Sequence, residues 1–271
     1  MSDSNHQSTL SQKQINSVIK LYSNGQYQEA IDSIKLLNEV YPNVPFLFNL
    51  IGACYKELGE LKGAVTMFET AVDIKPDYAE AHKNLGITLR DIGQLEAAAK
   101  TLKKAIEVDP GYVDAHYNLA ITFNDLGQFT DAIDYYEKTI ALNPNFAAAH
   151  NNLGNVLNGL GRNKYAIQSF EEAIRINPNF AEAFSNLGNV YKELNKFNSA
   201  VSSYQKAIKI KPNFIEAYNN LGILFDEHGQ LDFAVEIYEK LLLINPNFAE
   251  SHKNLGFIFL KLGKFKAAKS S

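Results

Sequence analysis

The chain has 271 residues, of which 46% are hydrophobic and 21% are charged, so it carries enough apolar side chains for a continuous core. Its formal net charge of -4 and isoelectric point near 5.9 argue against nucleic-acid partners and against binding to an anionic membrane. The single cysteine, Cys54, excludes an intrachain disulfide and a multi-cysteine zinc site, and its apolar surroundings predict a small core residue.

The first ten residues, MSDSNHQSTL, are rich in Ser, Asn and Gln, and we expect residues 1–10 to be disordered. The start has neither the basic segment nor the apolar run of a secretory signal. No later stretch approaches the roughly 20 apolar residues that a bilayer span needs. We therefore expect a soluble, cytoplasmic protein without membrane contact.

Prolines recur with a period of 34 residues along most of the chain. A period of this length is typical of arrays of helical hairpins, in which each repeat needs its neighbours to bury its apolar surface. Only Pro45 stands outside the phase. The periodic residues are Pro42, Pro76, Pro110, Pro144, Pro178, Pro212 and Pro246.

The period divides the chain into one degenerate repeat, six full repeats and one truncated repeat. Residues 11–44 keep Gly25 and Ala30 in phase but have Ser17 and Val18 where the other repeats have Leu and Gly, so they predict an N-terminal cap. Residues 45–248 hold the full repeats, which begin at residues 45, 79, 113, 147, 181 and 215. Residues 249–271 start a seventh, truncated repeat.

Within each repeat, small and bulky residues alternate as two packed helices require. Place 8 is Gly in most repeats and place 20 is always Ala, which lets two helix backbones approach closely, while place 24 is usually aromatic. Place 15 is Gly except for Asn195, and both residue types tolerate the left-handed conformation that ends a helix. The residue after the periodic proline, with a Glu three residues later, as in Asp77 and Glu80, predicts an N-cap of the next helix.

These features together resemble the tetratricopeptide-repeat (TPR) family across residues 11–271. Segments such as AHNNLGNVLNGLGR are most similar to the repeat domains of O-linked N-acetylglucosamine transferases and of bacterial repeat proteins. The resemblance implies an all-α, right-handed superhelix of helix-turn-helix hairpins. It also implies that the first helices line a concave groove, and that an asparagine ladder there holds the backbone of a bound peptide.

Asparagine recurs at place 6 of the first helices, broken only by Leu50. Asn is worse than Ala in a helix by roughly 0.6 kcal/mol, so its recurrence asks for a reason beyond helix propensity. An amide both donates and accepts hydrogen bonds, and helices roughly 8–10 Å apart would meet about every third residue of an extended peptide. Bonding of these amides to a neighbouring helix or to water is the open alternative. The candidate residues are Asn84, Asn118, Asn152, Asn186, Asn220 and Asn254.

Places 5 and 9 of the same helices flank this row and add further candidates. They make the middle of the array rich in amides, which favours ligand contact there, with a solvated polar face as the alternative. The set of lysines and asparagines with which some family members grip a C-terminal carboxylate is not present in any three consecutive repeats. The added candidates are Lys83, Tyr117, Asn151, Asn155 and Asn189.

The sequence offers no sign of a metal, a cofactor or a catalytic centre. His82, His116, His150 and His252 share place 4, where other repeats have Phe or Tyr, so the position favours a partly buried ring. One histidine per repeat is too sparse for shared coordination at about 2.0–2.1 Å. No phosphate-binding loop or nucleophile motif occurs, so we expect no cofactor and no enzyme activity from this chain alone.

The seventh repeat stops at Ser271 without a polar closing helix. Because arrays of this kind need a capping element, we expect the natural polypeptide to continue, with self-association through the uncapped end as the alternative. The sequence therefore predicts a protein-binding scaffold for an extended peptide. The alternative function is the substrate-recruiting part of a larger enzyme, such as a protein O-glycosyltransferase.

Overall fold

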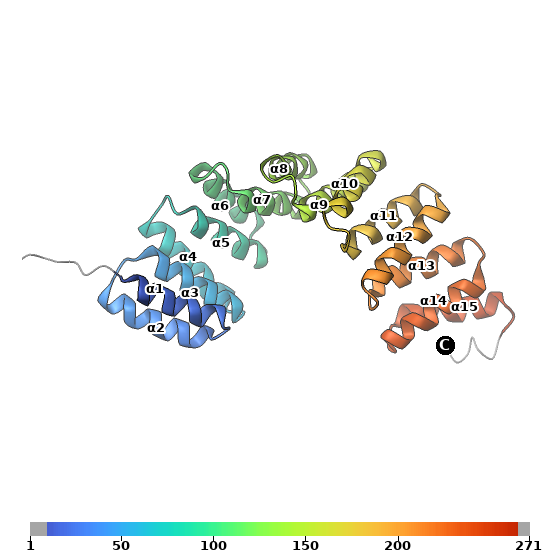
Figure 1. The fold of residues 1–271 in the computed structure, drawn as a ribbon, viewed down its shortest axis with the longest axis horizontal. Coiled ribbons are helices and arrows are strands. Elements are labelled where there is room, and N and C mark those ends of the chain that lie inside the picture. The colour runs from blue at the N-terminus through green and yellow to red at the C-terminus, as the bar shows by residue number, and fades with distance from the viewer. Residues whose placement is uncertain (1–9, 265–271) are drawn as a thin grey trace, which may run out of the picture. The chain divides into compact units, whose positions relative to one another are not determined.

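The computed structural model describes residues 10–264, and these form fifteen α-helices joined as consecutive hairpins (Figure 1). The expected disordered segment 1–10, apart from Leu10, and the last residues of the truncated repeat lie outside the described part. The chain divides into two compact units, residues 1–142 and residues 143–271, called here the N-terminal and C-terminal units.

The N-terminal unit holds eight helices and the C-terminal unit seven, among the residues described. The first eight are α1 (Gln12–Ser23), α2 (Tyr27–Val40), α3 (Pro45–Glu57), α4 (Leu61–Ile74), α5 (Ala79–Asp91), α6 (Leu95–Val108), α7 (Val113–Asp125) and α8 (Phe129–Leu142). The others are α9 (Ala147–Gly159), α10 (Asn163–Ile176), α11 (Ala181–Glu193), α12 (Phe197–Ile210), α13 (Ile215–Glu227), α14 (Leu231–Ile244) and α15 (Ala249–Lys261).

The all-α repeat architecture expected from the sequence is confirmed. Odd-numbered helices are the first helices of their repeats, and each of them from α1 to α13 packs most closely on the even-numbered helix that follows it. Within each unit, that second helix then packs on the next first helix, as α4 does on α5 and α12 does on α13. Contacts therefore join sequence neighbours, as in a solenoid.

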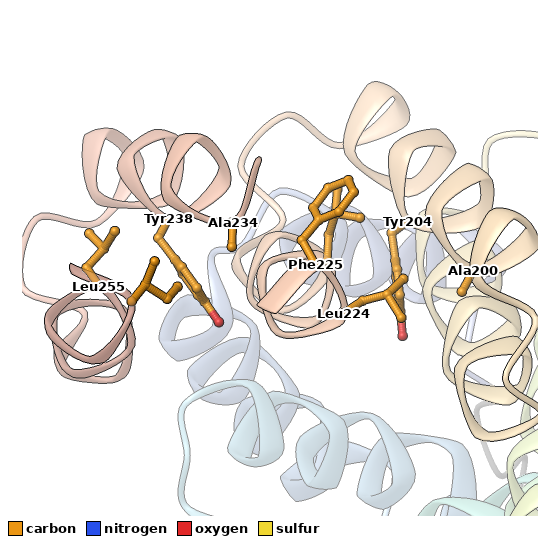
Figure 2. Close-up of a cluster of buried hydrophobic side chains, with 9 residues drawn as sticks. Ala200, Tyr204, Leu224, Phe225, Ala234, Tyr238 and Leu255 are labelled. Carbon is orange, nitrogen blue, oxygen red and sulfur yellow. The ribbon is translucent and has the colours of Figure 1, made fainter. Parts of the chain in front are cut away.

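Rings at place 24 fill the space opposite the glycines at place 8. In the C-terminal unit, Tyr204 of α12 and Tyr238 of α14 are almost completely buried together with Ala200 and Ala234 (Figure 2). A Cβ atom built on Gly188 would lie only 2.7 Å from Cε1 of Tyr204. The ring therefore fits in this position because place 8 carries no side chain.

The turns inside the hairpins confirm the expected left-handed conformation at place 15. Gly161 has a φ angle of 70°, and Asn195, the one exception to glycine, has a φ angle of 54°. Nothing lies within 4 Å of a Cβ atom built on Gly161, so backbone conformation alone selects the residue there.

This conformation gives a first prediction. Gly161→Ala is expected to lower the free energy of unfolding by about 1–2 kcal/mol, because a left-handed backbone strains any residue with a Cβ atom. Asn195→Gly, the matched change at a site that already tolerates this conformation, should stay within about 0.5 kcal/mol of the parent protein. Urea denaturation followed by circular dichroism measures both, and equal effects of the two changes would contradict the strain argument.

The predicted N-caps of the first helices are wrong. Helix α5 begins at Ala79, so its N-cap residue is Tyr78 and not Asp77, and no side-chain capping bond is made there. Among the described helices, a capping box forms at α1, where Ser11 and Gln14 bond reciprocally. The other first helices of the regular repeats follow α5, with Tyr112, Phe146, Phe180, Phe214 and Phe248 as uncapped N-cap residues.

The physical reason lies one step earlier in the loop. A backbone turn spans the proline, and in it the N–H of the N-cap residue donates to the carbonyl of the residue before the proline, as Tyr78 does to Lys75 at 3.1 Å. Where that residue is Asp or Asn, its side chain adds an Asx turn, as Asp109 does by accepting from the N–H of Gly111 at 3.0 Å. The Asp or Asn after the proline consequently lies outside the helix.

Ion pairs cross between successive first helices near their C-terminal ends. Each joins a lysine of one first helix to a carboxylate of the next or the previous one, and each is partly exposed to solvent. Partly exposed pairs contribute little stability, typically about 0–1 kcal/mol. The pairs are Lys56 with Asp91 at 3.0 Å, Lys192 with Glu227 at 3.1 Å and Lys261 with Asp226 at 2.6 Å.

Candidate functional site

All six asparagines at place 6 lie partly exposed on first helices. The N-terminal unit holds two of them, on α5 and α7, and the C-terminal unit holds four, on α9, α11, α13 and α15. The side chains are neither buried in the core nor fully solvated. They therefore form a polar row within each unit.

In the N-terminal unit, the amide of Asn84 is tied to the preceding first helix. Its Nδ2 donates to Oδ1 of Asn49 at 3.0 Å. Asn118 differs, because Lys83 stands where a place-5 amide would accept its bond. Its Nδ2 instead donates to the backbone carbonyl of Asp114 at 2.8 Å, and its Oδ1 accepts from Arg90 at 3.3 Å.

In the C-terminal unit, the same donor pattern returns with a variation. Asn186 donates to Oδ1 of Asn151 at 3.0 Å, and Asn151 donates to Oδ1 of Asn152 at 3.2 Å. Asn220 donates instead to Oδ1 of Asn189 at 3.0 Å. The structure thus joins three of the predicted amides, Asn151, Asn152 and Asn186, to one another, and it joins Asn189 to Asn220 of the next first helix.

The alternative of local bonding therefore holds for one side of each amide. For Asn84, Asn186 and Asn220, an N–H is used inside the protein, while Oδ1 has no hydrogen-bond partner among residues 10–264. These oxygens are not fully buried. Oδ1 of Asn219 and Oγ of Ser185, by contrast, are buried without a hydrogen-bond partner. The row thus offers fixed acceptors to an incoming donor.

The remaining predicted residues take different roles. Asn155 is exposed on α9, and its side chain forms no hydrogen bond with the amides of the row. The Lys83 ammonium lies 5.8 Å from the ring centre of Tyr112. The Tyr117 ring lies 6.1 Å from that of Tyr136. Lys83 and Tyr117 therefore contribute aromatic contacts within the N-terminal unit.

Two tyrosine hydroxyls that the sequence analysis did not single out complete the row. The Tyr204 hydroxyl donates to Oδ1 of Asn189 at 2.7 Å, and the Tyr238 hydroxyl accepts from Nδ2 of Asn254 at 3.0 Å. Burial raises the pKa of both tyrosines above the usual range, so the hydroxyls stay protonated. The signal in the sequence was Tyr in place of Phe at place 24, as compared with Phe170.

The histidines at place 4 have a structural role. In each case Nε2 lies within hydrogen-bond distance of the carbonyl oxygen of the periodic proline six residues earlier. A carbonyl only accepts, so Nε2 donates, and the ring ties the start of the first helix to the loop. The distances are 2.8 Å for His82, 2.9 Å for His116, 3.2 Å for His150 and 2.8 Å for His252.

A pocket of about 430 Å³ opens in the N-terminal unit between α1, α3 and α5. Leu50 and Ala53 of α3 line it, together with Asn49 and Asn84. Leu50 is the residue that breaks the asparagine row, and the sequence pattern had predicted no site at this position. The signal that was available is the pairing of Leu50 with Ala53, the smallest residue at place 9 in the chain.

Within residues 10–264, no three His, Cys, Asp or Glu side chains gather in a way that could hold a metal ion. None of the helices in that range is long and apolar enough to cross a bilayer.

Comparison with known proteins identifies the repeats. A family model described as TPR repeat matches more than half of the chain, at residues 52–91, 88–127, 154–195 and 188–229. Three models described as tetratricopeptide repeat match residues 113–146, 135–168 and 215–248.

Among curated proteins, the chain is similar to anaphase-promoting complex subunit 3 of Dictyostelium discoideum. The two are 41% identical over 56 residues, which is 21% of this chain and only 6% of the length of that protein. The similarity therefore concerns a short stretch of repeats.

Among solved structures, the fold is similar to that of MamA, with 30% identity, a TM-score of 0.57, and coverage of 60% of this chain and 95% of MamA. It is also similar to the C-terminal part of a TPR protein of Cytophaga hutchinsonii, with 21% identity and a TM-score of 0.69. That match covers 89% of this chain and 98% of the other, and it concerns the fold alone. The chain belongs to the tetratricopeptide-repeat family, whose domains generally act as protein-interaction scaffolds.

Proposed function

We propose that the protein holds an extended segment of a partner polypeptide against the asparagine amides of its first helices. The observation that carries this proposal is the pair of open acceptors in the C-terminal unit, Oδ1 of Asn186 and Asn220, each fixed by a hydrogen bond on the other side of its amide. Oδ1 of Asn84 is the equivalent acceptor in the N-terminal unit. A peptide main chain offers N–H donors at regular intervals, whatever its side chains. Recognition of this kind tolerates many sequences.

An interaction role, and not a catalytic one, agrees with the family, whose repeat domains are typically non-catalytic. The similar segment of the Dictyostelium protein belongs to a subunit of a protein complex, which supports a protein as the partner. Recruitment of substrates for a larger glycosyltransferase remains the prediction of the sequence resemblance, and a sugar-transfer assay on the full gene product tests it.

The proposal is tested with a panel of randomised dodecapeptides and with the same panel methylated on its backbone nitrogens. We expect the parent protein to retain the unmethylated panel at least about tenfold better, because methylation removes the N–H donors. Replacing Asn152, Asn186 and Asn220 together by Ala should reduce retention by a similar factor.

The matched control replaces Gln168, Gln205 and Glu239 by Ala, since these are exposed residues of second helices. Circular dichroism establishes that both triple variants are folded. Equal retention of the panel by the asparagine variant and the control would refute peptide binding through the amides.

A further inference from the structure

The pocket between α1, α3 and α5 interrupts the polar row with an apolar cavity. Phe68, which is 1% exposed, forms part of its lining, with Leu50 and Ala53 of α3 and Ile19 of α1. Ile19 is 39% exposed, so an apolar wall stands open to solvent at this point. A volume of about 430 Å³ lies within the range of about 300–1,000 Å³ that is usual for ligand pockets.

The lining holds fewer unpaired cations than carboxylates. Lys56 forms its ion pair with Asp91 at 3.0 Å. The Lys83 ammonium lies 5.8 Å from the ring centre of Tyr112, a contact that leaves its charge in place. One unpaired ammonium therefore stands against the carboxylates of the lining.

The carboxylates of the lining are not engaged. Glu57 and Glu80 have no ion-pair partner among residues 10–264. Their negative field reaches neighbouring groups: burial and then Glu57 raise the pKa of Tyr22, and burial and then Glu80 raise the pKa of Tyr112 to about 12. The unmatched charge at the pocket is negative.

The two carboxylates lie toward opposite ends of the pocket. Glu57 is the last residue of α3, and Glu80 is the second residue of α5, eleven places apart in the repeat. At 1.5 Å per residue the separation along the helix direction is roughly 16 Å. In an extended chain, residues two apart face the same side, and four residues span roughly 13 Å.

We propose that this pocket binds a partner segment in which one bulky apolar side chain, such as Phe, Leu or Met, has Lys or Arg two positions before it and two positions after it. The apolar side chain enters the cavity over Phe68, and the flanking cations reach Glu57 and Glu80 with their flexible stems. The inference adds an anchor with side-chain selectivity to the peptide binding proposed above, and it rests on Phe68, Glu57 and Glu80, which the binding to the amides does not involve.

The test uses capped heptapeptides with phenylalanine in the fourth position and either lysine or glutamate in the second and sixth, titrated into the full chain by calorimetry at low salt. We expect the lysine peptide to bind at least about tenfold more tightly than the glutamate peptide. Exchanging the phenylalanine of the lysine peptide for alanine should also reduce its affinity at least about tenfold. Absence of binding by the lysine peptide up to about 1 mM would overturn the inference.

Ala53→Leu fills the cavity, and we expect it to reduce the affinity for the lysine peptide at least about tenfold. Ala53→Ile is a second filling variant, since Ile87, Ile121 and Ile223 occupy the same place in other repeats. Glu57→Gln combined with Glu80→Gln should reduce both the affinity and its dependence on salt. Ile223→Leu in the C-terminal unit is the control that should leave binding unchanged.

An unchanged affinity in both filling variants would refute this site. The outcome is separable from that for the asparagine row, because the triple asparagine variant leaves α1, α3 and α5 intact. If the lysine peptide still binds that variant and fails to bind Ala53→Leu, the pocket is a site in its own right. If the protein retains the unmethylated panel but not the methylated one, and the lysine peptide does not bind, only the proposal of binding to the asparagine amides survives.

Discussion

Tyr204→Ala is expected to lower the free energy of unfolding by about 3–5 kcal/mol, the range found when a buried aromatic ring is removed from a well-packed core. The ring, which comes from α12, is 0% exposed and packs against α11 and, with Leu224, against α13 (Figure 2). Its hydroxyl donates to Oδ1 of Asn189. Its loss leaves a cavity that fixed helix backbones fill only in part. Urea denaturation of the full chain measures the change.

Tyr204→Phe is the matched control, because Phe68 and Phe170 occupy the same place in other repeats. It removes one hydrogen bond and keeps the ring, so the expected loss is about 0.5–1.5 kcal/mol. Solenoids unfold in parts, and hydrogen exchange should therefore show the loss of protection in α11–α13 first. Uniform destabilisation in both variants would contradict the role of the ring as a packing element.

Gly222→Ala is expected to destabilise the protein by about 1–3 kcal/mol through overpacking. The added Cβ atom would lie 2.7 Å from Cζ of Tyr238, whose ring is 1% exposed and whose hydroxyl is held by Asn254. In another repeat Ala120 holds this place and Tyr136 holds the ring place, and both are buried, so a methyl group can be accommodated there. The loss of stability in Gly222→Ala therefore measures how far the Tyr238 ring can shift to make room for the methyl group.

Gly159→Ala provides the control for this change. Gly159 ends α9, and nothing lies within 4 Å of a Cβ atom built on it. Alanine is the better helix former by about 1 kcal/mol, so thermal unfolding should occur at the same temperature or a higher one. A loss of stability at Gly159 equal to that at Gly222 would show that helix glycines are required for a reason other than ring contact.

Sequence periodicity was enough to predict the hairpin architecture, the left-handed turn at Asn195 and the small-to-aromatic contact of the two helices. These features follow from local rules repeated in each hairpin, such as the tolerance of Gly and Asn for positive φ. The N-caps were wrong because Asp77 and its equivalents lie inside the backbone turn that spans the proline, which Tyr78 closes by donating to the carbonyl of Lys75. A short polar residue after a proline is common both in turns and at N-caps, so the sequence alone does not separate the two.

The candidate site could be predicted less completely. The sequence placed Asn84, Asn186 and Asn220 correctly on first helices, but the direction of an amide depends on its side-chain rotamers and on whatever stands at place 5 of the neighbouring helix. The hydrogen bond between Asn189 and Tyr204 joins two helices of one repeat. Its prediction would have required the position of the Tyr204 hydroxyl, which the sequence does not give. The pocket arises from Leu50 and Ala53 together with α1, a combination that no single repeat displays.

The ion pairs between first helices bear on how such an array can change in evolution. Lys56 of α3 meets a carboxylate on the following first helix, whereas α15 supplies Lys261 to the preceding one. If recombination placed α15 directly after α3 and α4, these two lysines would face each other. The ion pairs therefore favour the present neighbours of α3, α13 and α15 over an exchanged order, by about 0–1 kcal/mol for each pair.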